Sequence, residues 1–232
     1  MDLDFVRPRR SVALSLVSGR GHYESVVAAV LEAQLSVWIA TANLKELMVE
    51  DPRAAPGRRR GGRRAAYRSV LAVLDELAGR GVDVRLLHAG VPSGPFAREW
   101  ARHPRLRGAL RLCPRLHLKA VVVDGALLYL GSANWTGAGL GAKGAGRRNF
   151  ELGIVTDDTE LLDEVQAIYD GIWRGLGCKG CKLRASCDAP LDTLISPPAV
   201  PEQQPAPQPR RPPSSGRRRR RAPDSPPRTP AT

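Results

Sequence analysis

Residues 116–134 place the strongest constraint on how this chain can fold. Two runs of β-forming apolar residues, 116–123 and 126–134, flank the dipeptide Asp124-Gly125. Asp-Gly between such runs is a strong local signal for a β-hairpin. A two-residue turn at this point would set His117 opposite Ser132 and Lys119 opposite Leu130. The sequence therefore predicts a hairpin whose register brings several polar side chains together.

The predicted hairpin separates polar from apolar side chains. Side chains alternate along a strand, and directly paired residues share a face. One face then carries an imidazole, an ammonium, a hydroxyl and a carboxamide, from His117, Lys119, Ser132 and Asn134. Such a set is suited to holding a phosphate rather than to building a core. Asp124 has the opposite parity, so we expect it to form the turn and brace the site from behind.

These side-chain types fit phosphodiester cleavage. The reaction needs a nucleophile or activated water, an acid for the leaving oxygen, and donors for the equatorial phosphate oxygens. His117 can fill either of the first two roles, and Lys119 supplies a positive charge to the phosphate. Ser132 and Asn134 are neutral donors.

The spacing of these residues resembles a known signature. His-x-Lys-x4-Asp-x6-Gly-Ser-x-Asn is similar to the signature of the phospholipase D superfamily, and Asn149-Phe150-Glu151 resembles a further motif of its small bacterial nucleases. The matching signature residues are His117, Lys119, Asp124, Gly131, Ser132 and Asn134. The resemblance implies that Glu151 hydrogen-bonds the His117 imidazole and fixes its orientation.

The resemblance covers roughly residues 11–176 and implies an α-β-α sandwich with a mixed central sheet. Family members with two copies of the motif build one site from both. A single copy therefore implies a homodimer in which His117 of each subunit faces one phosphate. One His117 would form a phosphohistidine and the other would protonate the leaving oxygen. The chemistry implied in this way needs no cofactor.

Hydrophobic periodicity independently favours an α/β fold. Strands are expected at 11–17, 36–41, 82–87 and 150–155, and helices at 22–34, 67–78 and 161–176. Alternating strands and helices indicate a sheet covered on both faces. Three regions are therefore expected: a phospholipase D-like catalytic domain (1–177), a Cys-rich appendage (178–190), and a disordered Pro/Arg-rich tail (191–232).

The chain is strongly basic, with a formal net charge of +13. Residues 189–232 hold eight arginines and three acids, so most of the excess lies in the remainder of the chain. Such a charge favours nucleic acid or an anionic membrane surface as a partner. Loop 51–64, with six arginines, is either a phosphate-binding arm or a solvated insertion. We expect Lys143, Arg147 and Arg148, in a glycine-rich and flexible segment 135–148, to bind substrate.

Three functions remain open from sequence alone. The first is a nuclease that hydrolyses DNA or RNA, which the basic charge and the resemblance to small nucleases favour. The second is a lipid phosphodiesterase acting on phosphatidylcholine or cardiolipin with the same residues. The third is a nucleic-acid-binding protein with vestigial catalysis.

Three of the four cysteines lie within ten residues, at Cys178, Cys181 and Cys187. Cys-x2-Cys followed by a further cysteine is a spacing that binds metal, and Cys113 is the obvious fourth ligand. The cluster is therefore expected to hold structural zinc or an iron–sulfur cluster, or alternatively to consist of free or redox-active thiols.

The N-terminal residues carry acids where a signal peptide would be positively charged. No stretch approaches the roughly 18 apolar residues of a membrane span. We therefore expect a cytoplasmic protein whose contact with membranes would be peripheral.

Overall fold

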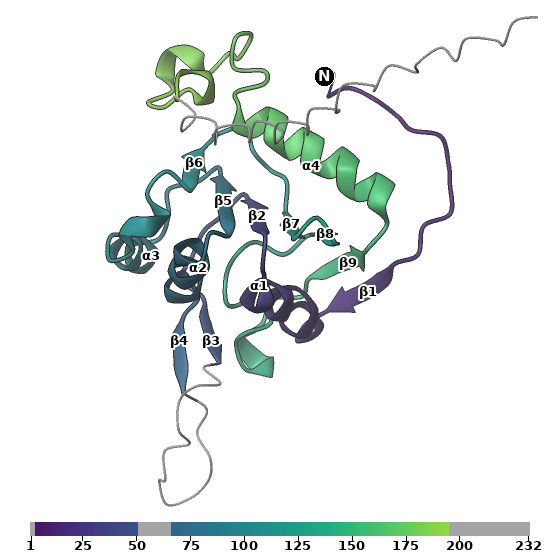
Figure 1. The fold of residues 1–232 in the computed structure, drawn as a ribbon, viewed down its shortest axis with the longest axis vertical. Coiled ribbons are helices and arrows are strands. Elements are labelled where there is room, and N and C mark those ends of the chain that lie inside the picture. The colour runs from purple at the N-terminus through teal and green to yellow at the C-terminus, as the bar shows by residue number, and fades with distance from the viewer. Residues whose placement is uncertain (1–2, 51–65, 195–232) are drawn as a thin grey trace, which may run out of the picture. The chain divides into compact units, whose positions relative to one another are not determined.

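The computed structural model describes residues 3–50 and 66–194. Its centre is a seven-stranded sheet of order β1-β9-β8-β7-β2-β5-β6 (Figure 1). Strands β2, β5 and β6 run parallel to one another, and the other neighbours pair antiparallel. The strands are β1 (Ser15–Ser18), β2 (Ser36–Thr41), β5 (Asp83–His88), β6 (Leu110–Leu112), β7 (Ala120–Val123), β8 (Leu127–Gly131) and β9 (Leu152–Thr156). Separately, β3 (Met48–Glu50) pairs with β4 (Tyr67–Ser69).

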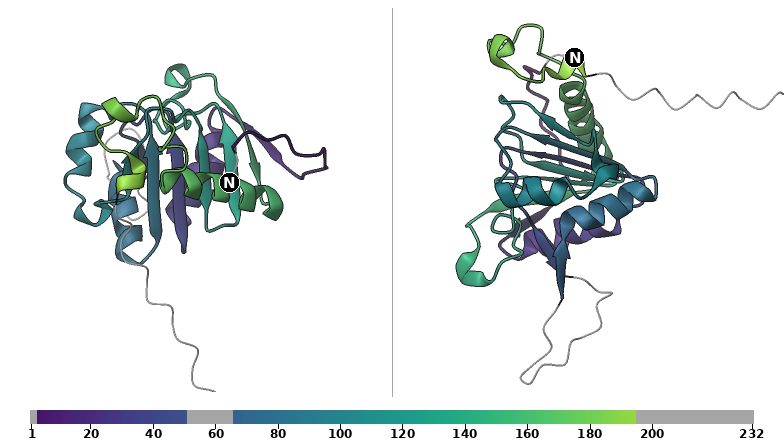
Figure 2. Two further views of the ribbon diagram at one scale, coloured as in Figure 1. Left: turned by 90° about the horizontal axis from the view of Figure 1, so that it is seen from above. Right: turned by 90° about the vertical axis from the view of Figure 1, so that its left-hand side faces the viewer.

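Helices cover both faces of the central sheet, as Figure 2 shows. A π-helical segment (Tyr23–Val27) that continues into α1 (Ala28–Glu32) packs on one face together with α2 (Val70–Gly79). The longer α4 (Thr159–Trp173) packs on the other face. The predicted α-β-α sandwich with a mixed sheet is therefore confirmed.

The position of β2 between the two cores explains why its sequence is continuously apolar. Val37 and Ile39 pack in the core under α1 and α2, whereas Ala40 packs in the core under α4. A strand that is covered on both faces has no solvent-facing side that would favour alternating polar residues.

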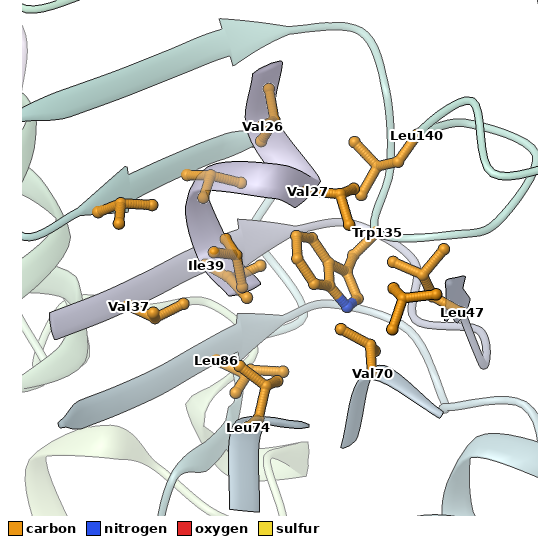
Figure 3. Packing of buried hydrophobic residues seen from close by; sticks show 14 of the residues in the cluster. Val26, Val27, Val37, Ile39, Leu47, Val70, Leu74, Leu86, Trp135 and Leu140 are labelled. Carbon is orange, nitrogen blue, oxygen red and sulfur yellow. The ribbon is translucent and has the colours of Figure 1, made fainter. Parts of the chain in front are cut away.

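The first of these cores includes a residue from the loop that follows β8. Figure 3 shows the Trp135 indole in a cluster of aliphatic side chains from helices, strands and loops. The other labelled residues of the cluster are Val26, Val27, Val37, Ile39, Leu47, Val70, Leu74, Leu86 and Leu140. Segment 135–148 is therefore not simply a flexible loop, because its first half is buried in the core.

Several element boundaries differ from those expected. Tyr67–Ser69 forms a strand rather than the first turn of a helix, and the Ser69 hydroxyl then caps α2 by accepting from the Leu71 N–H at 3.2 Å. The weakly patterned connection after β5 contains α3 (Gly94–Trp100) and β6. At α4, the Asp158 carboxylate accepts from the Leu161 N–H at 2.9 Å and so caps the helix.

The predicted hairpin forms, but its register is shifted by one residue. The Ala126 N–H bonds to the Val123 carbonyl at 2.9 Å, and the next ladder pair is then Val123 with Leu127. Ala126 is thus an extra residue outside the ladder, as in a β-bulge. The expected pairing of His117 with Ser132 and of Lys119 with Leu130 is therefore wrong. The Lys119 carbonyl instead accepts from the Gly131 N–H at 3.2 Å.

The remaining sequence-based regions lie partly outside the described residues. The arginine-rich loop 51–64 lies outside them, as does the tail beyond residue 194. The predicted start of the tail at 191 is too early, because Leu191 is buried against the core under α4 and 191–193 form a 3-10 turn. Within residues 3–50 and 66–194, no helix combines the length and apolar character that crossing a membrane requires.

Candidate active site

Most of the signature side chains gather at one end of the central sheet. This is the end where β2 and β8 finish and where β7 and β9 begin. His117 and Lys119 precede β7, whereas Ser132 and Asn134 follow β8. Glu151 directly precedes β9. The antiparallel order β9-β8-β7-β2 thus brings together residues from four parts of the chain.

His117 and Lys119 contact each other directly. The Lys119 ammonium lies 3.1 Å from Nε2 and 3.2 Å from Nδ1 of the His117 imidazole, and it donates to the His117 carbonyl oxygen at 3.0 Å. The His117 side chain is exposed. A fixed positive charge beside an accessible imidazole can hold a phosphate oxygen while the ring nitrogen approaches phosphorus.

Glu151 contacts a different partner from the one expected. Its carboxylate accepts from the Ser132 hydroxyl at 2.5 Å and from the Asn149 amide at 3.0 Å. Among the described residues, no hydrogen bond joins Glu151 to His117, although the resemblance implied one. Ser132 is also tied to the start of β9, because its backbone N–H donates to the Leu152 carbonyl at 3.0 Å.

Asn134 is held by residues that the sequence analysis did not single out. Its Oδ1 accepts from the Asn43 backbone N–H at 3.1 Å and lies 3.2 Å from the Thr41 hydroxyl. Thr41 in turn accepts from the Trp135 N–H at 2.9 Å. With the amide oxygen bound on this side, the Asn134 NH2 group is left to donate to an anion. The sequence did contain a signal for these residues. A buried strand ends in Thr41-Ala42-Asn43, and strand ends often carry functional polar residues.

Gly131 has a packing role in the signature. A Cβ atom at this position would lie 2.3 Å from the Tyr129 hydroxyl and 2.8 Å from the Cα of Gly153, its partner on β9. The Tyr129 ring therefore lies across this glycine pair, and its oxygen accepts from the Ala133 N–H at 3.3 Å. Burial raises the pKa of Tyr129 to about 12, so the phenol remains neutral at physiological pH.

Asp124 lies at the opposite end of the hairpin from the other signature residues. Its carboxylate accepts backbone N–H groups of Gln34, Leu35 and Ser36 at 2.9, 2.7 and 2.8 Å. Burial acts to raise the pKa of Asp124, but these hydrogen bonds prevail and hold that pKa below its usual value. Asp124 follows His117 by seven residues, and an extended chain of that length spans about 23 Å, so Asp124 does not touch the reacting groups. The catalytic role predicted for Asp124 is not supported by this position, and Asp124 braces the start of β2 rather than the back of the site as expected.

A polar cleft of about 570 Å³ adjoins Asn134. Lys143, which was expected to bind substrate, lines this cleft. Lys45 lines it too, although nothing in the sequence had singled out that residue. Arg148 does not line it, because its Nε donates to the Lys143 carbonyl at 2.7 Å. Arg147 is exposed at the end of a 3-10 turn, also outside the lining. The complete lining is Asn43, Lys45, Glu46, Ser93, Pro95, Asn134, Thr136, Gly137, Ala138, Lys143 and Asn149.

The other three histidines are held by contacts within the chain. His22 is buried, with its Nδ1 3.3 Å from the Gly19 carbonyl, and burial lowers its pKa. His88 is buried and contacts the Gly90 carbonyl at 2.7 Å, again with a pKa lowered by burial. His103 contacts Glu99 at 3.1 Å. His117 is therefore the one accessible imidazole that a single chain brings to this end of the sheet.

Several solved structures resemble this chain. NucT from Helicobacter pylori is 18% identical, with a TM-score of 0.46, over 69% of this chain and 94% of its own. The phospholipase D family member Nuc from Salmonella typhimurium is 18% identical, with a TM-score of 0.47, over 70% of this chain and 95% of its own. Polyphosphate kinase from Porphyromonas gingivalis is 13% identical, with a TM-score of 0.42, over 68% of this chain and 25% of its own.

No curated protein matches the chain. A family model does: residues 62–173 match the family described as "Cardiolipin synthase, PLD-like domain". The matched residues run from the segment before β4 to the end of α4, and they include the hairpin with its signature and Glu151. Residues 62–173 of this chain are therefore similar to the PLD-like domain of that family.

Proposed function

We propose that this protein is a nuclease that hydrolyses DNA or RNA phosphodiesters through His117. The observation that carries the proposal is the chemistry of the cleft beside Asn134. Its lining includes two lysines and three asparagines but no large aliphatic or aromatic side chain. A polyanionic backbone finds positive charge and amide donors there, whereas a lipid acyl chain finds no apolar wall.

The side chains at this end of the sheet supply the groups that the reaction needs. The His117 imidazole attacks phosphorus, so that a P–N bond forms as the bond to the leaving oxygen breaks. The Lys119 ammonium and the Asn134 amide stabilise the equatorial oxygens. Water then attacks the phosphohistidine, which breaks the P–N bond and releases the phosphate product.

The same proposal includes a homodimer, because the leaving oxygen needs a proton donor and one chain brings one accessible histidine here. His117 of the partner subunit gives its proton to the leaving oxygen and recovers one from the attacking water. An apolar surface near Glu151 supports this assembly. Phe150 is fully exposed, and Leu16 and Leu152 are 67% and 55% exposed on one face of the β1–β9 pair. A second copy of the chain is the occupant that we assign to this surface.

Oligomeric state tests the dimer separately from activity. We expect light scattering after size exclusion to give twice the chain mass for the wild type. Leu16→Asp and Phe150→Asp should shift the protein toward monomer, whereas Val6→Asp, at an exposed residue outside this surface, should not. A fully active monomer would contradict the dimer.

A lipid phosphodiesterase is the second candidate, and the same apolar surface favours it. Exposed Phe and Leu side chains can enter the headgroup region of a bilayer while basic residues contact its anionic lipids. The two candidates use the same His117 chemistry, so the choice of substrate separates them.

One substrate panel tests the nuclease. Plasmid DNA, single-stranded DNA, RNA, and vesicles of phosphatidylcholine or cardiolipin are incubated with the protein in EDTA. We expect cleavage of nucleic acid by the wild type and by His103→Gln, and none by His117→Ala. Turnover of lipid alone would replace the nuclease with the second candidate. Salt-sensitive binding of DNA without turnover of any substrate would indicate a binding protein with vestigial catalysis.

A further inference from the structure

All four cysteines of the chain lie around one small cavity, which shares no lining residue with the cleft beside Asn134. Cys113 comes from the loop between β6 and β7. Cys178, Cys181 and Cys187 come from the segment that follows α4. These two segments are far apart in sequence, yet the four residues line the same cavity of about 30 Å³. That volume accommodates about one water molecule or ion.

Local backbone hydrogen bonds present the cysteines to this cavity. The Cys181 N–H bonds to the Cys178 carbonyl at 3.1 Å, which closes a tight turn with a thiol at each end. A 3-10 turn, Arg184–Ser186, then leads to Cys187. On the other side, the Cys113 N–H bonds to the His88 carbonyl at 2.8 Å and so ties its loop to the end of β5. Two thiols on one short turn are the usual half of a tetrahedral thiolate site.

The four thiols are not paired as disulfides. Among the described residues, no three His, Cys, Asp or Glu side chains are already positioned around a common metal ion. The four cysteines therefore line one cavity, but their sulfur atoms are not yet positioned to coordinate a single ion. Coordination would require each thiol to lose its proton to solvent and its sulfur to move inward onto the ion.

The segment that carries three of the cysteines has little apolar material of its own. From residue 178 to residue 194, Leu191 is the one buried hydrophobic residue, and Leu183 is 42% exposed. Its regular structure consists of two 3-10 turns. Burial of a single leucine offsets little of the conformational entropy lost when such a segment is ordered. Small segments of this kind usually depend on a disulfide or a metal crosslink.

Basic side chains surround the cluster. Arg115 and Arg184 line the cavity with the cysteines, and Lys179 and Lys182 lie between them in sequence. Arg184 is also paired with Asp192 at 2.7 Å, and Arg115 donates to the Gly177 carbonyl at 3.4 Å. Four thiolates around one Zn²⁺ carry a net charge of −2, which nearby cations stabilise.

We propose that Cys113, Cys178, Cys181 and Cys187 bind one structural Zn²⁺ ion as four thiolates. The ion crosslinks the segment after α4 to the loop that leads into His117. The proposal rests on the four cysteines alone and is independent of the substrate proposed above.

Metal analysis of the full chain tests the proposal directly. We expect protein purified without chelator to contain about one zinc per chain. The chain has no other cysteine, so a mercurial titration should release all the zinc as four thiols react. Co²⁺ bound in place of zinc should give the intense visible bands of a tetrahedral thiolate site. Cys113→Ser should lose most of the zinc, whereas Lys179→Ala, which keeps every thiol, should retain it.

Two results would overturn the proposal. Protein without metal, whose four thiols react freely before and after incubation with Zn²⁺, would show that the cavity binds no ion. Iron and inorganic sulfide in place of zinc, with a brown colour that Cys113→Ser abolishes, would show that the four thiols hold a cluster instead. Neither result depends on whether the protein cleaves nucleic acid.

Discussion

The two ends of the β7–β8 hairpin carry residues of one signature but use them in opposite ways. At the end where β7 begins, His117 is exposed, and Lys119 is the hydrogen-bond partner of its imidazole among the described residues. At the turn, Asp124 is saturated by three backbone N–H groups. A polar group whose hydrogen bonds are all made within the chain stabilises the fold, whereas an exposed imidazole is available to a substrate. The signature therefore combines an exposed end, which we propose to be the reactive one, with a structural end.

The largest effect should come from the reactive end. We expect His117→Ala to lower phosphodiester hydrolysis by at least about 10³-fold, because it removes the nucleophile. Its melting temperature should stay close to that of the wild type, since the lost side chain is exposed. Initial rates and thermal unfolding measured on the same preparations check this. If His117→Ala lost much of its stability together with its activity, His117 would also stabilise the fold, and the distinction between the two ends would be wrong.

At the structural end, the effect should fall on stability instead. We expect Asp124→Asn to lower the free energy of unfolding by about 1.5–3 kcal/mol, because a neutral amide replaces a carboxylate that accepts several N–H groups. Asparagine also tolerates the positive φ of 55° at this position, so the backbone itself is not strained. Denaturant unfolding gives the difference. Activity per folded molecule should not change, and a catalytic defect at equal stability would contradict this assignment.

The pH dependence of that difference sharpens the test. The pKa of Asp124 is lowered in the folded protein from its ordinary value of 3.8. Its contribution is thus fully present above the unfolded pKa and is lost as pH falls through the lower, folded pKa. The stability difference between wild type and Asp124→Asn should be constant above about pH 5 and shrink below about pH 4. If unfolding curves across this range showed that the stability difference between the two proteins grows as the pH falls, the assignment would be refuted.

Between the two ends, Gly131 links the packing of the sheet to the site. We expect Gly131→Ala to cost about 1–3 kcal/mol of stability, because its methyl group would overlap the Tyr129 ring and the Gly153 backbone. Gly144→Ala is the matched control, since nothing lies within 4 Å of the added carbon there. Equal unfolding free energies for the two variants would show that the sheet accommodates the methyl group.

The smallest effect should come from substitutions in the cleft, and it should fall on KM. We expect Lys143→Ala to raise KM for DNA by about 3- to 10-fold at low salt with little change in kcat, because an exposed lysine contributes a screened charge. Arg147→Ala, at an exposed residue outside the cleft lining, should change KM less. The difference between them should shrink as salt is added, and the reverse order would show that the polyanion follows a different path.

Local patterns in the sequence predicted the parts of the fold that local chemistry determines. The buried run 36–41 is strand β2 at the predicted bounds, and Asp158 caps α4. The hairpin was predicted from Asp124-Gly125, but its register was not. The shift depends on a single residue, Ala126, which lies outside the ladder, and no periodicity in the two strands distinguishes the two registers.

The candidate site was predicted where the signature defines it and missed where the fold alone creates it. His117, Lys119 and Asn134 lie at one end of the sheet, and their catalytic roles stay predictions. Thr41 and Asn43 hold Asn134 across a strand pairing between β2 and β7 that no local pattern encodes. Lys45 likewise reaches the cleft because of the fold and not because of a local sequence pattern. Short connecting segments such as α3 carry too few periodic residues to be recognised.

Trapping the covalent intermediate tests the nuclease proposal most directly. The protein is mixed with a single-stranded oligonucleotide, quenched during turnover at alkaline pH, digested, and mapped by mass spectrometry. We expect a phosphorus-linked nucleotide adduct on His117 in the wild type and none in His117→Ala. Rapid turnover with no adduct at His117, or an adduct on another residue, would contradict nucleophilic catalysis by this histidine.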